Sequence, residues 1–294
     1  MNKDDINKLI SSSDIYIPEL YDIWNDEEDQ QPIYIRKVNY IEWDIFADKI
    51  LNRDLTFYRN IVKNLVAGDV YVLKNAVSPY HVKKIKDTCM DFALKNTSSH
   101  FKVLDDSPDF FRTADIEAAK KYGFYRCNTL FHFYRWNNSE LFKIADLTWD
   151  ILKMASGINK EAFKKMIPSN GLVDRLHIHL YPPDIGEQEK HQDPFIIQKI
   201  VMGHAMSIRG VDYKCGGIYF INPDQEEVDV DSLLNQGDCY ICFPSLVHGV
   251  KKIKGLDNPS SNHLNFNGRW FMGFYTLWSD VNTLRYTGTP WTNS

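Results

Sequence analysis

The segment from Val173 to Asp193, VDRLHIHLYPPDIGEQEKHQD, decides the fold that the sequence predicts. Its first nine residues alternate between apolar and polar side chains, which is typical of a β-strand with one face against a core. The apolar face would hold Leu176, Ile178 and Leu180, and the polar face Arg175, His177, His179 and Tyr181. Such a strand, taken alone, more often turns its polar face to solvent. A polar face that lines an interior binding site is the other interpretation.

The same segment ends in His191-Gln192-Asp193, directly after a turn that contains proline and glycine. Side chains two residues apart on an extended chain point to the same side, so His191 and Asp193 can both bind the same metal ion. His248 follows the apolar run 237–243, which predicts a buried strand that carries this second histidine towards the pair. Two imidazoles and one carboxylate hold a non-haem Fe(II) and leave coordination positions open. We therefore predict a metal site at His191, Asp193 and His248.

The order of these motifs resembles the Fe(II)/2-oxoglutarate-dependent oxygenase superfamily. An aromatic strand, a turn and His-x-Asp come first, and the later motifs are Gly216-Gly217, Gly237-Asp238, His248-Gly249 and Arg269 at the start of an aromatic strand. The resemblance covers residues 172–278. It is weaker over 69–95, where a strand and a Ser-Pro-capped helix look like the entry of the phytanoyl-CoA and prolyl hydroxylase branch.

The resemblance implies an α+β fold with a mainly β core, a double-stranded β-helix (jelly roll) flanked by N-terminal α-helices. It implies that His191, Asp193 and His248 ligate Fe(II), with 2-oxoglutarate and O₂ as co-substrates. Arg269 would pair with the distal carboxylate of 2-oxoglutarate, a role that suits a planar, permanently charged donor. His179 and Tyr181 would lie against the co-substrate.

The implied reaction is hydroxylation, or a related desaturation or cyclisation, of a C–H bond in a small molecule, with release of succinate and CO₂. Halogenating relatives lack the carboxylate ligand, so Asp193 favours hydroxylation over halogenation. Two features depart from the family pattern. Arg269 lies farther beyond His248 than is usual, which an extra loop over 255–267 explains, although Lys251 or Lys252 could take its role. Phe271 stands where many members have Ser or Thr, so the second anchor of the co-substrate stays open.

Two other classes of protein fit part of this pattern. A cupin-type metalloenzyme would use His177, His179 and His248 without 2-oxoglutarate. Cupin sites place a carboxylate a few residues after His-x-His, whereas Glu187 follows His179 by eight residues, beyond a turn. A non-catalytic metal-binding jelly-roll protein is the other alternative, but such a protein has no need of the co-substrate anchor Arg269.

The substrate is less well defined by the sequence. The aromatic stretch 124–136 carries four side chains that could line a pocket mouth, Arg126, His132, Arg135 and Trp136, although a packed strand with outward arginines is an equal interpretation. Arg175 and His177 could contact a substrate from the interior face of their strand. Several cations near one pocket suit an anionic small molecule.

Composition excludes some classes of function. The chain has 294 residues, of which 44% are hydrophobic and 14% aromatic, so it can bury a large core rich in strands. A net charge of −5 gives no overall basic surface and argues against a nucleic-acid partner. Five cysteines predict no disulfide framework and favour reduced thiols in the cytoplasm. Cys239 and Cys242 would face opposite sides of a strand, which disfavours a redox or zinc pair.

The sequence predicts one domain over 1–294, with a mixed helical part over 1–170 packed on a jelly-roll core over 171–280. Helices are expected over 41–51, 139–156 and 160–167, and after the Ser78-Pro79 cap. Early strands are expected over 32–38 and 69–73, and later ones over 217–221, 227–230, 237–243 and 269–278. We expect neither a secretion signal nor a membrane span, because no apolar run approaches 18 residues.

Overall fold

The computed structural model describes residues 14–27, 31–120, 125–165, 171–193, 197–257, 266–281 and 289–291. Its helices are α2 (Pro18–Glu27), α3 (Trp43–Leu51), α4 (Leu55–Val66), α5 (Pro79–Lys95), α6 (Ile116–Ala119) and α7 (Ser139–Ala155), with a 3₁₀ turn η2 (Asp231–Leu233). Its strands are β1 (Val38–Glu42), β2 (Val70–Lys74), β3 (Phe110–Ala114), β4 (Arg126–Phe133), β5 (Leu172–Tyr181), β6 (Glu187–Gln192), β7 (Val201–Ala205), β8 (Cys215–Ile221), β9 (Glu227–Asp229), β10 (Cys239–Cys242), β11 (His248–Lys254), β12 (Arg269–Trp278) and β13 (Thr289–Pro290).

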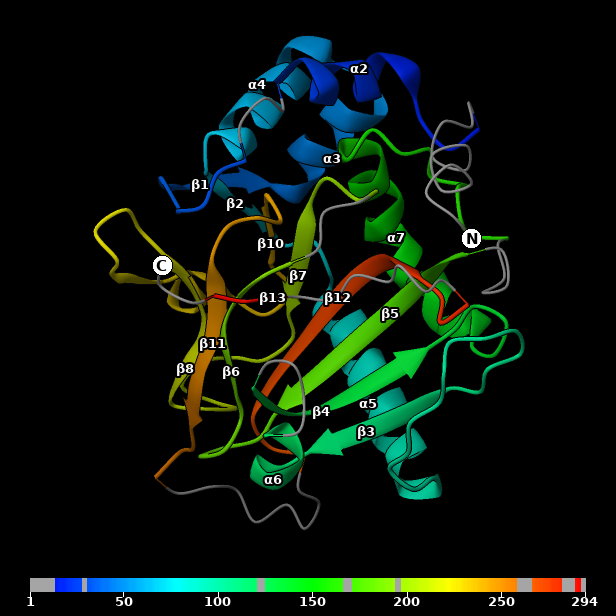
Figure 1. Cartoon of the computed structure of the whole chain (residues 1–294), viewed down its shortest axis with the longest axis vertical. Coiled ribbons are helices and arrows are strands. Elements are labelled where there is room, and N and C mark those ends of the chain that lie inside the picture. Colours follow the sequence, from blue (N-terminus) through cyan, green and yellow to red (C-terminus); the bar gives the residue numbers. More distant parts are fainter. Residues whose placement is uncertain are drawn as a thin grey trace.

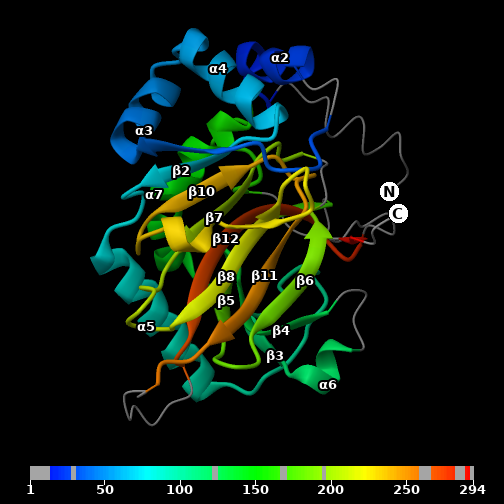
Figure 2. The ribbon, with the colours of Figure 1, turned by 90° about the vertical axis from the view of Figure 1, so that its left-hand side faces the viewer.

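The strands form two layers that are joined at one edge. The larger layer runs β1-β2-β10-β7-β12-β5-β4 with β3 beside β4, and the smaller layer runs β6-β11-β8-β9 with β13 beside β6. A short pairing of β4 with β6 connects them. Figure 2 looks onto the smaller layer, where β6, β11 and β8 lie side by side. This arrangement is the predicted jelly roll within an α+β fold.

A small apolar core fills part of the space between the two layers. It combines Val72, Tyr240 and Phe271 from the larger layer with Ile218 and Phe220 from the smaller one. Burying side chains of this size between facing sheets is the main favourable contribution to such a sandwich. The core occupies only part of the space between the layers, and the remainder is the cavity described below.

The helices cover the outer face of the larger layer. In Figure 1, α2, α3 and α4 gather at one end, while α5 runs behind β3 and β4. The apolar face of β5, which holds Leu176, Ile178 and Leu180, belongs to the large core beneath these helices. Trp149 of α7 stacks on Phe274 of β12 with ring centroids 4.8 Å apart. The helices therefore pack on the outer face of β5 and β12, and the inner face of these strands lines the cavity described below.

Local sequence signals account for the ends of two helices. Ser78 Oγ accepts a hydrogen bond from the backbone N–H of His81, so the predicted N-cap of α5 is present. After α7 the chain reverses at Gly157, whose φ of +74° is the left-handed conformation that glycine favours after a helix. No helix in the described part of the chain is long and apolar enough to cross a membrane.

Two predicted elements need correction, and one helix was not predicted. The early strand begins at Val38 and not at Pro32, because residues 32–37 run without ladder pairing. The helix expected over 160–167 is a series of turns over 160–165, and residues 166–167 lie outside the described ranges. Helix α4 is an addition to the prediction. Its signal is present in the sequence, since Asp54 caps it by accepting from the N–H of Phe57.

The buried cysteines of β10 behave as the sequence predicts. Cys239 packs in the core beneath the helices, whereas Cys242 packs in the core between the layers. The two side chains therefore face opposite sides of the strand, and both are free thiols. Burial raises the pKa of each thiol above its usual value, which makes them unreactive at neutral pH.

Candidate metal centre

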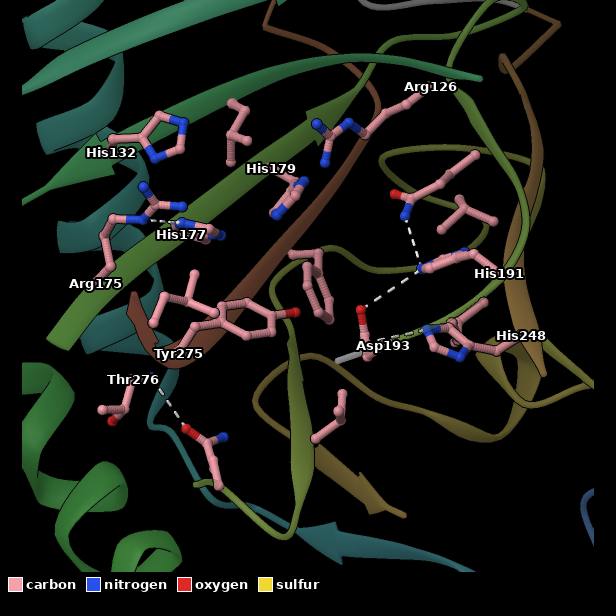
Figure 3. Close-up of a pocket in the computed structure, with 18 of the residues that line it drawn as sticks. Arg126, His132, Arg175, His177, His179, His191, Asp193, His248, Tyr275 and Thr276 are labelled. Carbon is pink, nitrogen blue, oxygen red and sulfur yellow. Dashed lines mark hydrogen bonds and ion pairs between the residues drawn. The ribbon is translucent and has the colours of Figure 1, made fainter. Parts of the chain in front are cut away.

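The site is a cavity between the two layers, lined on one side by the polar face of β5. Arg175, His177, His179 and Tyr181 all face this cavity, as the alternation in the sequence predicts. Figure 3 shows Arg175, His177 and His179 across from His191, Asp193 and His248, which lie in or next to the smaller layer. The polar face of β5 is therefore interior, and the solvent-facing interpretation is wrong.

Pairing of two strands brings the histidines together. His191 lies near the end of β6 and His248 opens β11, and the two are direct partners in the antiparallel ladder. Their ring centroids are 4.3 Å apart. Asp193 follows β6, and its N–H donates to the backbone carbonyl of Pro244 at 3.1 Å. Its carboxylate lies 3.9 Å from His191 Nε2 and 3.5 Å from His248 Nε2.

The ligand atoms of these three residues lie within 4.8 Å of one another, in the one such group found among the described residues. His191 Nδ1 donates to the carbonyl of Glu189 at 2.9 Å, and His248 Nδ1 donates to the carbonyl of Leu246 at 2.8 Å. These bonds place the proton of each ring on Nδ1 and the lone pair on Nε2, where His191 accepts from Gln188 in this metal-free arrangement. The arrangement fits one divalent metal ion.

The charges of the cluster depend on one another. Burial works to raise the pKa of Asp193, but the hydrogen bond and charge of His248 outweigh it and leave that pKa below its usual value. Burial lowers the pKa of His248, yet its bond to Asp193 raises it overall. Burial and the neighbouring His248 lower the pKa of His191 to about 4. The negative charge of Asp193 beside two histidines thus favours binding of a cation between the three side chains.

Gln188 is a site residue that the sequence analysis missed. It lies on β6, three residues before His191, and its Nε2 donates to His191 Nε2 at 2.9 Å. Its Oε1 accepts a hydrogen bond from the hydroxyl of Tyr181 at 2.8 Å. Gln188 therefore joins the metal cluster to the polar face of β5. Nothing in its local sequence marks it, because its position depends on the pairing of β6 with β4 and β11.

Arg269 reaches the same cavity from the start of β12, where it is the ladder partner of Tyr181. It is only 3% exposed, and its Nε donates to Asp231 Oδ1 at 2.6 Å. Asp231 also accepts from Tyr213 and from the N–H of Ile218, so its carboxylate is held by three partners. Asp231 thereby holds the guanidinium of Arg269 in one orientation through its Nε. Asp231 was not predicted as a site residue, because it lies 38 residues before Arg269 in the sequence.

The lysines considered in place of Arg269 lie elsewhere. Lys251 pairs with Glu227 at 2.7 Å, and Lys252 lies 3.4 Å from Glu187, both outside the cavity lining. Of these three cations, Arg269 is the one that lines the cavity. Most of the insertion 255–267 falls on residues 258–265, which lie outside the described ranges.

The two polar residues predicted to lie against a co-substrate are in the cavity. Tyr181 lies beneath the Arg269 guanidinium, 5.8 Å from its ring centroid, and stacks on His179 at the same distance. Asn128 Nδ2 donates to His179 Nδ1 at 2.9 Å, which fixes the tautomer with its proton on Nε2. Burial and then the charge of Arg126 hold the pKa of His179 well below its usual value, so its ring is neutral.

The cupin-type ligand set is not assembled. Arg175 Nε donates to His177 Nε2 at 2.7 Å, and Asn128 occupies Nδ1 of His179. Neither ring joins His248 in a group that could hold a metal, within the described residues. The geometry therefore disfavours the interpretation in which His177, His179 and His248 bind a metal.

The predicted substrate residues divide into two groups. Arg126, His132, Arg175 and His177 line the cavity. Arg135 does not, because Asp146 holds its guanidinium through two bonds of 2.7 Å and Asp174 through one of 3.2 Å. Trp136 also lies elsewhere, with its Nε1 donating to the carbonyl of Ser107. We therefore do not retain Arg135 and Trp136 as substrate contacts. Arg112 of β3 lines the cavity and was not anticipated.

Fold and site together define a jelly-roll protein with a candidate centre of two histidines and one carboxylate. No protein-family model matches the sequence, and no curated protein matches it either. Among solved structures, the chain is similar to a full-length Neurospora crassa protein in complex with alpha-KG, with a TM-score of 0.47 and 11% identity over 84% of this chain and 86% of that one.

Two further structures are similar at the same level. A Pseudomonas putida prolyl-4-hydroxylase has a TM-score of 0.43 and 11% identity, over 70% of this chain and 91% of its own. An oxidoreductase of the 2OG-Fe(II) oxygenase family from Burkholderia pseudomallei has a TM-score of 0.42 and 10% identity, over 86% of this chain and 98% of its own. With likeness at this level, a functional assignment depends on the geometry of the site itself.

Proposed function

We propose that the protein is a non-haem Fe(II) and 2-oxoglutarate-dependent dioxygenase that oxidises a C–H bond of a small molecule. The observation that carries the proposal is the cluster of His191, Asp193 and His248, whose two Nε2 atoms face one carboxylate inside a cavity. This donor set is typical of non-haem Fe(II) sites that keep coordination positions open. Asp193 completes the set and favours hydroxylation, desaturation or cyclisation over halogenation.

Arg269 is the group that would bind the distal carboxylate of 2-oxoglutarate. Asp231 occupies its Nε, and none of the hydrogen bonds formed among the described residues uses its Nη groups. Paired Nη groups form a fork that matches a carboxylate. The aromatic rings of Tyr181 and Phe271, 5.8 and 5.5 Å from the guanidinium, restrict its movement and exclude water around it. The anchor is thus oriented before the co-substrate arrives.

With Fe(II) bound, the metal would supply the oxidative chemistry that couples decarboxylation of 2-oxoglutarate to substrate oxidation. The chain's own contribution is positioning. Backbone carbonyls orient the two histidines, Asp231 orients Arg269, and the apolar walls of the cavity keep bulk water from the reacting groups.

The test is an anaerobic titration of the Fe(II)-loaded protein with 2-oxoglutarate, followed by the visible iron-to-ketoacid charge-transfer band. We expect a saturable band in the wild type. In Arg269→Ala the band should need about tenfold or more 2-oxoglutarate, because a charge-assisted pair is lost. Lys251→Ala is the matched control, since this cation pairs with Glu227 outside the cavity and should leave the titration unchanged.

The outcomes separate the candidate functions. Asp193→Ala should lower the iron content of the protein as well as abolish the band. Iron bound by the wild type without any band would overturn the role of 2-oxoglutarate and leave a metal-binding jelly-roll protein. An iron content and a band that are both unchanged in Asp193→Ala would show that Asp193 is not a ligand.

A further inference from the structure

The inner face of β12 carries a tyrosine that the chemistry described so far does not use. Arg269, Phe271, Gly273 and Tyr275 alternate along this face, because side chains two residues apart on a strand share one side. Tyr275 lines the cavity, and Figure 3 shows it extending from β12 towards Asp193. Its hydroxyl forms no hydrogen bond with the described residues. The hydroxyl is therefore free to bind a ligand in the cavity.

Gly273 directs the side chain of Tyr275 along β12. A Cβ at Gly273 would lie 2.6 Å from the Tyr275 ring and 3.0 Å from its hydroxyl oxygen. The tyrosine thus lies over Gly273 and leans towards the end of the strand that holds Arg269. Gly273 is not among the residues with positive φ, so the close ring contact, and not the backbone, requires a glycine here. The hydroxyl consequently reaches the level at which Gly273 pairs with His177.

His177 offers a second hydrogen-bond donor at that level. Arg175 Nε donates to His177 Nε2 at 2.7 Å, and a guanidinium can only donate. The lone pair of His177 is therefore on Nε2 and its proton on Nδ1. Figure 3 shows the second ring nitrogen of His177 on the side away from Arg175. The rings of His177 and Tyr275 have centroids 4.9 Å apart, so the two donors lie close together.

Both groups stay uncharged donors at neutral pH. Burial, and then the charge of Arg175, hold the pKa of His177 well below its usual value. Burial, and then the charge of Asp193, raise the pKa of Tyr275 well above its usual value. The imidazole is therefore neutral and the phenol keeps its proton.

The carboxamides that line the cavity do not offer a free acceptor to this pair. Gln188 Oε1 accepts from the hydroxyl of Tyr181, and Gln198 Oε1 accepts from the backbone N–H of Thr276. Polar groups shielded from bulk water are normally hydrogen-bonded. An acceptor oxygen of a ligand would satisfy both donors at once.

We propose that Tyr275 and His177 bind a carbonyl oxygen of the substrate, and that the substrate is a small ketone, ester or amide. A carbonyl oxygen has two lone pairs for two donors, and it carries no hydrogen that needs an acceptor of its own. The inference rests on the proposed function, because the oxidised C–H bond must lie near His191, Asp193 and His248. Binding of the carbonyl would fix which neighbouring carbon faces the metal.

The experiment compares three probes that share one fluorophenyl body: 4-fluoroacetophenone, 1-(4-fluorophenyl)ethanol and 4-fluoroethylbenzene. Fluorine NMR titrations measure their binding to the metal-free protein and to the Zn(II)-loaded protein with saturating 2-oxoglutarate, which occupies Arg269. We expect the ketone to bind about fivefold or more tightly than the alcohol and the hydrocarbon, as one or two hydrogen bonds allow.

Three variants test the assignment to Tyr275. Tyr275→Phe removes only the hydroxyl and should abolish most of the preference for the ketone. Gly273→Ala should weaken the preference as well, because the new Cβ displaces the tyrosine ring. Tyr80→Phe is the matched control, since Tyr80 is exposed on α5 and does not line the cavity.

Each result has a distinct meaning. Equal binding of the ketone and the alcohol by the wild type would overturn the proposal, and so would failure of the ketone to bind at millimolar concentration. A preference that survives in Tyr275→Phe would also overturn it. A preference in the metal-free protein that depends on Tyr275 would stand even if the protein failed to bind Fe(II) or 2-oxoglutarate.

Discussion

The role of a single residue in this protein depends on which face of its strand the side chain lies on. Asp174 and Arg175 are adjacent, yet one belongs to the ion-pair network beneath the helices and the other to the cavity. The same alternation separates Leu180 in the core from Tyr181 at the site. A shift of the strand by one residue would exchange the two sets, so the register of β5 specifies the site.

Gly217 shows how a residue outside the cavity can control the anchor of a co-substrate. Its φ is +106°, and a Cβ at this position would lie 2.1 Å from the Asp231 side chain. Gly217→Ala must therefore displace the carboxylate that holds Arg269. We predict that 2-oxoglutarate binds about tenfold more weakly to this variant, because Arg269 loses its fixed orientation. The charge-transfer titration measures this affinity.

Gly210→Ala separates backbone strain from loss of the anchor. Gly210 has a similar φ of +87°, but nothing lies within 4 Å of a Cβ built there. Both alanine variants should lose about 1–2 kcal/mol of unfolding free energy through the left-handed backbone. If Gly210→Ala weakened 2-oxoglutarate as much as Gly217→Ala, the proposed link through Asp231 would be wrong.

Among the elements, the pairing of β3 with β4 carries a titratable group. Asp109 precedes β3 and accepts from the backbone N–H of Tyr134, just beyond β4, at 2.8 Å. Burial raises the pKa of Asp109 to about 6, against the hydrogen bonds from Tyr134 and Asn137, which lower it. The folded protein thus binds this proton more tightly than the unfolded chain. Stability from this group is present at low pH and is lost as the pH rises through about 6.

We predict that Asp109→Asn is more stable than the wild type at pH 7.5, by roughly 1–3 kcal/mol. The amide keeps an oxygen for Tyr134 and Asn137 but carries no charge to desolvate. The difference should shrink as the pH falls to 5, and urea unfolding at several pH values measures it. Asp224→Asn, at an exposed turn, should follow the wild-type curve. A constant offset at all pH values would contradict the assignment to ionisation of Asp109.

The sequence predicts those elements whose pattern is local. The alternation in β5 and the apolar runs of β10 and β12 indicate buried strands, and the Ser78 cap indicates the start of α5. Strand β6, with the sequence EQEKHQ, carries no such pattern. It is a strand because β4, β11 and β13 supply its hydrogen-bond partners, and this information is not local.

The same limit applies to the candidate site. His191, Asp193 and His248 stand out because their residue types and order fit metal ligation, and the structure brings them together. Gln188 and Asp231 do not stand out, since their roles come from pairing between distant strands. Arg135 was misplaced because the cavity side of β4 holds Arg126, Leu130 and His132, and Arg135 is an odd number of residues from each of them and lies beyond the end of the strand.

At the scale of the whole molecule, Asp174 ties the helical layer to the sheet. Its carboxylate accepts from Lys153 of α7 at 2.5 Å and from Thr276 of β12 at 2.9 Å, and lies 3.2 Å from Arg135. Asp174 and Lys153 are each 1% exposed. Burial lowers the pKa of Lys153, against the charge of Asp174, which raises it. Removing one partner from a buried pair leaves a charge without compensation.

We predict that Asp174→Asn lowers the free energy of unfolding by about 3–5 kcal/mol, measured by urea denaturation at pH 7. Asp150→Asn, which breaks a less buried pair of α7 with Lys164, should change the free energy of unfolding by no more than about 1 kcal/mol, because burial raises the pKa of Asp150 against the effect of Lys164. In Asp174→Asn the pKa of Lys153 should fall further, so the folded state sheds its proton before the unfolded chain does. The unfolded chain then binds more protons, and the loss of stability should shrink as the pH rises from 7 towards 9.5. A loss that stays constant over this range would show that packing, and not the charge of Lys153, is what Asp174 maintains between the helices and the sheet.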